Sequence, residues 1–150
     1  MKHVYVESEL SGIAAEVLSF VPARDTGATV LALSGSLGAG KTTLTKAIGQ
    51  KLGITDVVVS PTFVIAKWYT PTTGPYTTVV HIDAYRIEDE SELTALGFTE
   101  LLTHPKTLVI IEWPERLPNA LRTVPLCLFL LDHHGEHRSI EGPLSYERIN

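Results

Sequence analysis

The sequence predicts one α/β domain in which helices flank a central sheet of mixed parallel and antiparallel strands. An apolar, partly β-branched run at 28–34 is followed by a glycine-rich loop and then by a stretch with helical spacing. Further along, extended runs at 64–69 and 77–83 are separated by a short turn rich in proline and glycine, which predicts an antiparallel hairpin. Because the first unit is typical of parallel sheets and the second is antiparallel, we expect a mixed sheet.

The composition limits the class of protein. The 150 residues fit one domain, 1–150, and a hydrophobic fraction of 44% with a charged fraction of 19% indicates a soluble globular chain. No apolar run approaches the roughly 20 residues of a membrane span, and the start of the chain lacks the apolar core of a signal peptide. We therefore expect a cytoplasmic protein that does not enter a membrane. The single cysteine excludes a disulfide framework, and a net charge of −5 without a long basic block argues against direct binding of nucleic acid.

Hydrophobic spacing and turn signals divide the chain into alternating strands and helices. The clearest helical stripe follows the N-cap candidate Ser8 and ends at Pro22. In order, we expect a strand at 4–6, a helix at 8–21, the strand 28–34, a helix at 43–52, extended segments at 57–59 and 64–69, the strand 77–83, one or two short helices within 88–102, the strand 107–112, a short irregular or 3₁₀ segment at 114–121, the strand 126–131 and a final strand near 137–140.

The glycine-rich loop carries the strongest functional signal. Residues 35–42 read G-S-L-G-A-G-K-T and match the P-loop pattern G-x-x-x-x-G-K-[ST] at every fixed position. Because the loop lies between a predicted strand and a predicted helix, we expect a P-loop NTPase-like sandwich. Backbone N–H groups of the loop can hold phosphate oxygens at the positive end of the helix. Lys41 would reach the β- and γ-phosphates, and the Thr42 hydroxyl would bind Mg²⁺. The residues expected to bind the nucleotide here are Leu37, Gly38, Ala39, Gly40, Lys41, Thr42 and Thr43.

Two carboxylates end apolar strands, where a nucleotide hydrolase needs acids near its metal ion. Asp83 ends V-V-H-I-D, and Glu112 ends L-V-I-I-E. One acid would hold Mg²⁺, directly or through water, and the other would orient the attacking water or the substrate. Either one alone could equally be a solvated strand end or a helix cap, but the P-loop favours the functional interpretation of both.

Other polar residues have weaker signals. In the segment S-P-T-F at 60–63, Thr62 is a candidate sensor of the γ-phosphate, although a proline-centred turn with Phe63 in the core is an alternative. His81 is interpreted as a structural residue with satisfied hydrogen bonds rather than a catalyst. Trp113 could belong to the core or to a partner contact. The histidines at 133, 134 and 137 fit a solvated hairpin better than a metal site.

Four stretches together resemble the bacterial TsaE family, also called the YjeE family. They are the P-loop, S-P-T-F at 60–63, H-I-D-A-Y-R at 81–86 and I-E-W-P-E-R at 111–116, and the resemblance runs from about residue 8 to residue 140. Members of the family are small P-loop ATPases that act with the TsaB and TsaD proteins. The resemblance implies that ATP hydrolysis supports turnover of the TsaB–TsaD complex, which makes threonylcarbamoyladenosine at position 37 of tRNAs that read codons starting with A. The tRNA would be contacted only through that complex.

The resemblance also implies roles for individual residues. It makes ATP and Mg²⁺ the cofactors, with Thr42 and Glu112 as metal ligands and with Lys41 and Asp83 as catalytic residues. Glu115 and Arg138 fall where the family has further ATP contacts, and Trp113 falls beside the site. The chain departs from the family at Ser36, where an acidic residue is usual.

Three other classes of function compete with an ATPase. In a small-molecule kinase of the P-loop type, Asp83 would deprotonate an acceptor hydroxyl, but the six arginines do not cluster as a lid. A GTP-driven switch would need a guanine-reading N-K-x-D motif, and neither asparagine lies in such a setting. A module that binds ATP for assembly without hydrolysing it would differ from the ATPase only in turnover.

Overall fold

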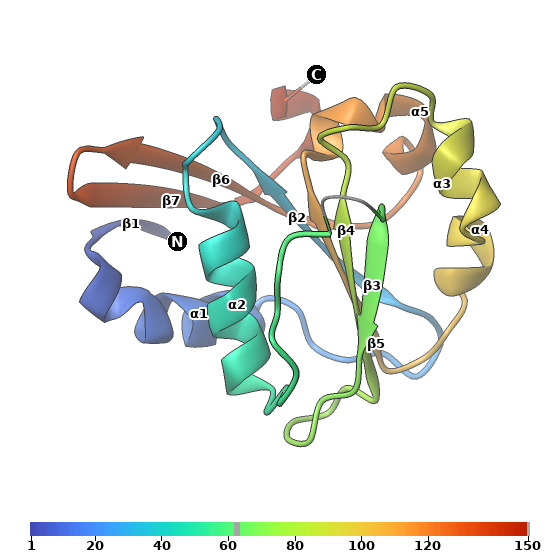
Figure 1. The fold of residues 1–150 in the computed structure, drawn as a ribbon, viewed down its shortest axis with the longest axis horizontal. Helices are drawn as coiled ribbons and strands as arrows, with labels where there is room; N and C mark the ends of the chain where they lie inside the picture. Colours follow the sequence, from blue (N-terminus) through green and yellow to red (C-terminus); the bar gives the residue numbers. More distant parts are fainter. Residues whose placement is uncertain (62–63, 150) are drawn as a thin grey trace.

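The computed structural model describes residues 1–61 and 64–149. Within these residues, seven strands form one sheet in the order β1-β7-β6-β2-β5-β4-β3 (Figure 1). The strands are β1 (Lys2–Tyr5), β2 (Thr29–Ser34), β3 (Ala66–Tyr69), β4 (Thr78–Asp83), β5 (Thr107–Glu112), β6 (Cys127–His134) and β7 (His137–Leu144). The α-helices are α1 (Leu10–Ser19), α2 (Lys41–Lys51), α3 (Ser91–Ala95), α4 (Phe98–Leu101) and α5 (Pro118–Leu121), and short 3₁₀ helices span Glu7–Glu9, Pro114–Arg116 and Tyr146–Ile149.

The sheet is mixed, as the sequence predicts. The central strands β6, β2, β5 and β4 are parallel. Antiparallel partners extend both sides: β3 pairs with β4, and β7 pairs with both β6 and β1. The predicted fold class is therefore confirmed, and the hairpin expected between the extended runs near 64–69 and 77–83 is present as β3 and β4.

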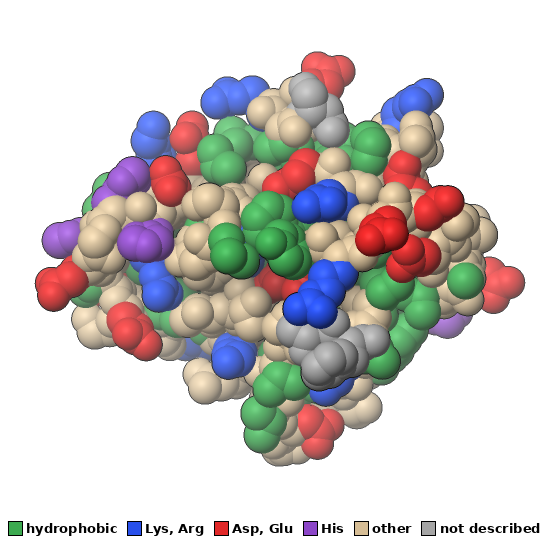
Figure 2. Space-filling model, turned by 45° about the horizontal axis from the view of Figure 1, so that its top comes forward, with side chains coloured by type: hydrophobic (Ala, Val, Ile, Leu, Met, Phe, Trp, Pro, Cys, Tyr) green, Lys and Arg blue, Asp and Glu red, His purple; other side chains and the backbone are tan. Residues whose placement is uncertain are grey.

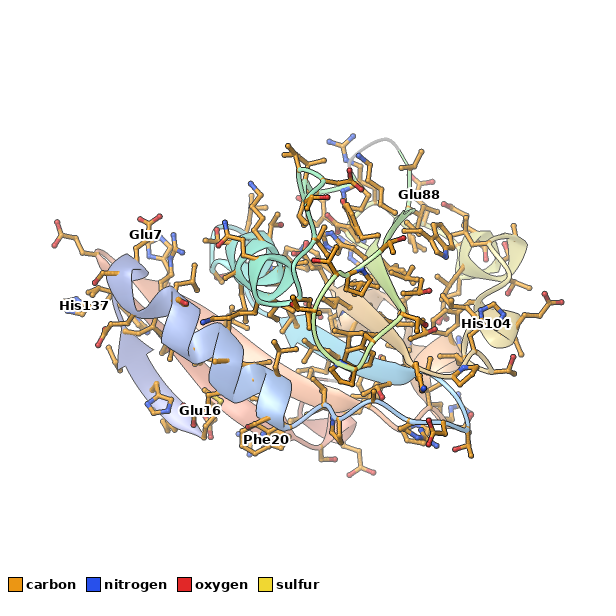
Figure 3. All side chains as sticks on the ribbon, turned by 90° about the horizontal axis from the view of Figure 1, so that it is seen from below. Glu7, Glu16, Phe20, Glu88, His104 and His137 are labelled. Carbon is orange, nitrogen blue, oxygen red and sulfur yellow. The ribbon has the colours of Figure 1, made fainter. Side chains whose placement is uncertain are left out.

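Helices cover both faces of the sheet because the central strands are apolar on both sides. Leu31 of β2 joins a core with Leu44 and Ile48 of α2, whereas its neighbour Val30 joins a second core that contains helical residues of α4 and α5. Seen from below, α1 lies along the β6–β7 hairpin (Figure 3). There the ring of Phe20 meets Phe129 of β6 edge-on, with ring centroids 5.9 Å apart.

Several predicted boundaries differ from the observed ones. The helix expected over 8–21 begins as a 3₁₀ turn and ends at Ser19. The extended segment expected at 57–59 is wrong, since it joins no strand. Val57 is 79% exposed, whereas Val58 is buried beside Gly49 of α2 and so packs on a helix instead of pairing with a strand. The last two predicted strands are longer than expected and form the hairpin of β6 and β7.

The described helices are short. None of those in residues 1–61 and 64–149 has the length and apolar character that a crossing of the bilayer requires.

Candidate functional site

The glycine-rich loop connects β2 to α2 and needs glycine at particular positions. Gly40 precedes the first residue of α2 with a φ of 101°, in the left-handed region. Gly35 has a φ of 149°, and a Cβ there would lie 2.3 Å from the carbonyl oxygen of Leu131 in β6. The loop therefore turns tightly against β6, and its backbone at the start of α2 is open to a ligand.

Lys41 lies inside its own loop. Its Nζ donates to the carbonyl oxygens of Gly35 at 2.6 Å and Ser36 at 2.8 Å, and it lies 4.0 Å from the centre of the Trp113 ring. Burial lowers the pKa of this lysine, while the negative charges of Glu112, Glu115 and Asp83 oppose that shift. The cation is thus held by carbonyl dipoles and an aromatic face, contacts that phosphate oxygens can replace.

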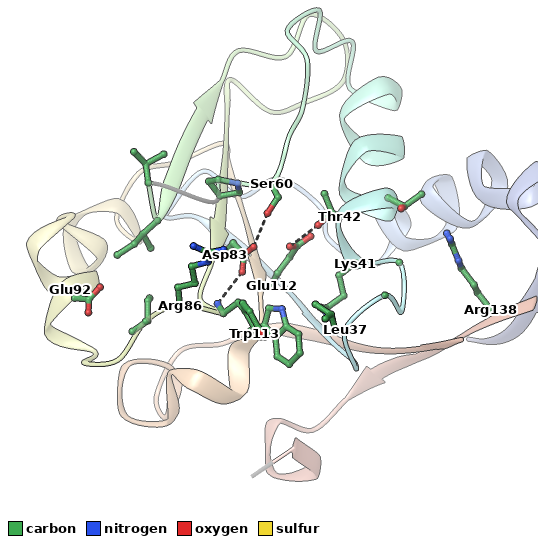
Figure 4. A pocket seen from close by; sticks show the side chains of 18 residues that line it. Leu37, Lys41, Thr42, Ser60, Asp83, Arg86, Glu92, Glu112, Trp113 and Arg138 are labelled. Carbon is green, nitrogen blue, oxygen red and sulfur yellow. Dashed lines mark hydrogen bonds between the residues drawn. The ribbon is translucent and has the colours of Figure 1, made fainter. Parts of the chain in front are cut away.

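The two predicted acids face the loop side by side. Asp83 and Glu112 are direct register partners at the ends of β4 and β5. Glu112 is 1% exposed, and its Oε2 accepts a hydrogen bond of 3.0 Å from the Thr42 hydroxyl. Asp83 accepts from the Ser60 hydroxyl at 2.8 Å and from the Tyr85 backbone N–H at 3.0 Å. The structure therefore brings the P-loop and both strand-end acids into one site (Figure 4).

These oxygen groups fit Mg²⁺. The ion usually takes one or two protein oxygens together with water and phosphate oxygens, and the Thr42 hydroxyl and the Glu112 carboxylate lie at hydrogen-bond distance from each other beside the open loop. A carboxylate this deeply buried needs either donors or a cation. Thr42 and Glu112 are accordingly the residues that would hold the metal.

A pocket of about 720 Å³ joins the predicted residues, within the usual range for small-molecule sites. It extends from Arg138 on one side of the P-loop to Arg86 and Glu92 on the other (Figure 4). The predicted site residues that line it are Leu37, Gly38, Gly40, Lys41, Thr42, Thr43, Asp83, Glu112 and Arg138. Three other predicted residues are not among its described lining: Ala39, which is fully buried, Glu115, and Thr62, which falls outside the described residues.

Arg138 and Glu115 flank the loop with unpaired atoms. The Arg138 guanidinium on β7 would lie 3.2 Å from a Cβ at Gly40. Its Nη1 and the Oε2 of Glu115 are both buried without a hydrogen-bond partner in the described part of the chain. The negative charge of Glu115 also acts to raise the pKa of Lys41. Both residues lie beside the P-loop, although only Arg138 lines the pocket.

Aromatic rings line the wall of the pocket next to Lys41. Trp113 follows β5 directly and adopts a left-handed φ of 60°. Its ring meets that of Tyr85, with centroids 4.8 Å apart, and the Arg116 guanidinium lies over Tyr85. Trp113 is thus packed both against the site and, partly buried, against the neighbouring core.

Sequence reasoning missed three contacts of the two acids. The Ser60 hydroxyl donates to Asp83. Thr45 lies 3.4 Å from Glu112, and His81 lies 3.5 Å from the same carboxylate. Thr45 could have been found, because it follows Thr42 by three residues on the face of α2 that meets the sheet.

Comparisons with known proteins show the family of this chain. The sequence model of the family described as "Threonylcarbamoyl adenosine biosynthesis protein TsaE" matches residues 5–140. The chain belongs to the TsaE family. Curated relatives include the "tRNA threonylcarbamoyladenosine biosynthesis protein TsaE" of Bacillus subtilis, which is 46% identical over 61% of this chain and 54% of the relative. The protein of the same name in Haemophilus influenzae is 33% identical over 76% of this chain and 69% of the relative.

The similarity to TsaE proteins extends to a solved structure. The crystal structure of Bacillus subtilis YdiB superposes with a TM-score of 0.68 at 29% identity, covering 93% of this chain and 82% of that one. The chain spans about half the length of the first curated relatives that it matches. Within the described residues, each of the four TsaE-like stretches contributes side chains to the single pocket around Lys41.

Proposed function

We propose that the protein binds MgATP in the pocket around Lys41 and hydrolyses it during threonylcarbamoyladenosine biosynthesis. The observation that carries this proposal is the hydrogen bond of 3.0 Å between Thr42 and Glu112, with Asp83 paired in register beside it. The Thr42 hydroxyl lies in the first turn of α2, and the two carboxylates lie at the adjacent ends of β4 and β5. Such oxygen groups are what an Mg²⁺-dependent phosphoryl transfer uses. Membership of the TsaE family is the reason for assigning the reaction to threonylcarbamoyladenosine biosynthesis.

Each residue has a distinct task in the proposed reaction. Lys41 would exchange the carbonyl oxygens of its own loop for the oxygens of the β- and γ-phosphates. Thr42 and Glu112 would hold Mg²⁺, which neutralises charge on those oxygens when it is bound. Asp83, fixed by Ser60 and by the Tyr85 N–H, would orient the attacking water toward the γ-phosphorus. Arg138, on the opposite side of the loop, would contact the nucleotide from β7.

The pocket also favours a partner that completes it. Leu37 is 74% exposed at its rim, and hydrophobic side chains gather beside basic and acidic ones on the face that Figure 2 shows. Efficient hydrolysis needs exclusion of water and positive charge near the γ-phosphate. An arginine or a lid supplied by another protein can raise such a rate by roughly 10³ or more. We therefore propose that TsaB and TsaD dock here and stimulate turnover. We also propose that the protein reaches tRNA only through these partners. The reaction would take place in the cytoplasm.

Phosphate release tests this function. We expect slow release of free phosphate from ATP by the protein alone and faster release when TsaB and TsaD are present, with Lys41→Ala inactive in both cases. A phosphorylated small molecule in place of free phosphate would support the kinase alternative. Equal turnover with and without the partners would contradict stimulation, and no turnover in either case would contradict the ATPase.

A further inference from the structure

His81 is a buried histidine next to the candidate magnesium site. It is fully buried in β4, on the same face of the sheet as Asp83 because side chains two residues apart in a strand point the same way. Its Nε2 lies 3.5 Å from Oε1 of Glu112, which is beyond ordinary hydrogen-bond distance. Neither ring nitrogen has a hydrogen-bond partner among residues 1–61 and 64–149. The hydrogen bonds expected of a structural histidine are therefore not seen among the described residues.

The two oxygens of the Glu112 carboxylate differ in the hydrogen bonds that they accept from the described residues. Its Oε2 accepts from Thr42 at 3.0 Å. Its Oε1 lies 3.4 Å from the hydroxyl of Thr45, but that hydroxyl has one proton and lies closer, at 3.0 Å, to the carbonyl oxygen of Lys41. If the Thr45 hydroxyl donates its proton to the carbonyl oxygen of Lys41, His81 is the remaining side-chain donor beside Oε1 within residues 1–61 and 64–149. A carboxylate that is 1% exposed is costly without such donors.

We propose that His81 is a positioning residue for the metal ligand Glu112. The ring carries a proton on Nε2 and donates a hydrogen bond from it to Oε1, which leaves Oε2 and the Thr42 hydroxyl facing the metal ion of the bound nucleotide. Removal of a residue that hydrogen-bonds a metal ligand commonly weakens metal binding by about 10- to 100-fold. The magnesium part of this inference rests on the proposed function, whereas the position of the ring proton does not.

A residue that lines a small cavity beside the His81 ring provides a matched control variant. The cavity is lined by Thr45, Tyr69 and His81 together with apolar residues of β4, β5 and the segment after α2. The Tyr69 hydroxyl, like the ring nitrogens, is buried and has no partner in the described residues. Tyr69→Phe therefore removes a polar atom from the wall of the same cavity without altering Glu112 or any of its neighbours.

The ring proton can be located directly. Nitrogen-15 NMR of the nucleotide-free wild-type protein, with the His81 signal assigned by its loss in His81→Gln, distinguishes a proton on Nε2 from one on Nδ1. The proposal predicts a proton on Nε2, and a ring that carries its proton only on Nδ1 overturns it. This measurement stands even if the protein binds no nucleotide, and so it separates failure of this inference from failure of the proposed function.

A substitution series tests the effect on magnesium. Glutamine places an N–H group as many bonds from the backbone as Nε2, whereas asparagine places one at the position of Nδ1. With a fluorescent ATP analogue, we expect His81→Asn to raise the half-saturating Mg²⁺ concentration about tenfold or more. His81→Gln and Tyr69→Phe should stay near wild type, and nucleotide binding in EDTA should be unchanged in all three. Equal effects of glutamine and asparagine would overturn the proposal. If a variant does not fold, the NMR result decides.

Discussion

Thr42 and Glu112 are 70 residues apart in the sequence, yet the Thr42 hydroxyl donates to the Glu112 carboxylate at 3.0 Å. The contact joins the first turn of α2 to the end of β5, and it places a buried carboxylate against the opening of the phosphate-binding loop. This contact is the basis of our proposal that a threonine and a glutamate hold one cation here.

The first prediction concerns the metal. Glu112→Gln keeps the shape of the side chain and can still accept from Thr42, but it removes the negative charge that attracts Mg²⁺. We expect the half-saturating Mg²⁺ concentration for binding of a fluorescent ATP analogue to rise at least about tenfold, with binding in EDTA little changed. If the variant shows the same magnesium dependence as wild type, Glu112 is not a metal ligand.

The second prediction separates the two acids. Asp83→Ala should leave binding of MgATP nearly intact and slow phosphate release by about 10²-fold or more, because a group that orients water acts mainly in the transition state. Titration of the fluorescent analogue and a phosphate-release assay measure the two effects. Loss of magnesium-dependent binding in Asp83→Ala, with Glu112→Gln binding normally, would show that the two roles are reversed.

Much of the site could be predicted from the sequence because its key residues stand at the ends of recognisable elements. Lys41 and Thr42 follow from the loop pattern, and Asp83 and Glu112 follow from the apolar strands that they end. Side-chain contacts that depend on strand register could not be predicted, and the proximity of His81 to Glu112 is one of them. The approach of Arg138 to Gly40 likewise depends on a hairpin that returns β7 to the P-loop. The resemblance indicated Arg138 as an ATP contact, but neither it nor hydrophobic spacing indicated the approach to Gly40.

The third prediction uses the contact between Lys41 and Trp113. Phosphate oxygens should draw the Lys41 ammonium away from the indole, and this change in local field should alter the tryptophan emission when ATP binds. The other tryptophan, Trp68, is 52% exposed on β3 and does not line the pocket. We expect Trp68→Phe to retain the ATP-dependent change and Trp113→Phe to lose it. The opposite pattern would mean that Lys41 does not leave the ring.

The fourth prediction concerns the backbone of the loop. Gly35→Ala should lower the free energy of unfolding by about 2 kcal/mol or more, because its Cβ would meet the Leu131 carbonyl oxygen at 2.3 Å. Gly12→Ala is the matched control, since Gly12 lies on an exposed part of α1 with open space around it. There the loss of backbone freedom in the unfolded chain should stabilise by about 0.5–1 kcal/mol. Urea denaturation followed by circular dichroism measures both changes, and equal stability of the two variants would contradict the tight loop.

The most direct test of the account is a titration of wild type and Lys41→Ala with a fluorescent ATP analogue in the presence of Mg²⁺. Lys41→Ala should keep the circular dichroism spectrum of wild type and bind about 10- to 100-fold more weakly, as expected for the loss of charged hydrogen bonds. Lys46→Ala removes an exposed lysine of the same helix and should bind like wild type. Undiminished binding by a folded Lys41→Ala protein would contradict the claim that this pocket is the ATP site.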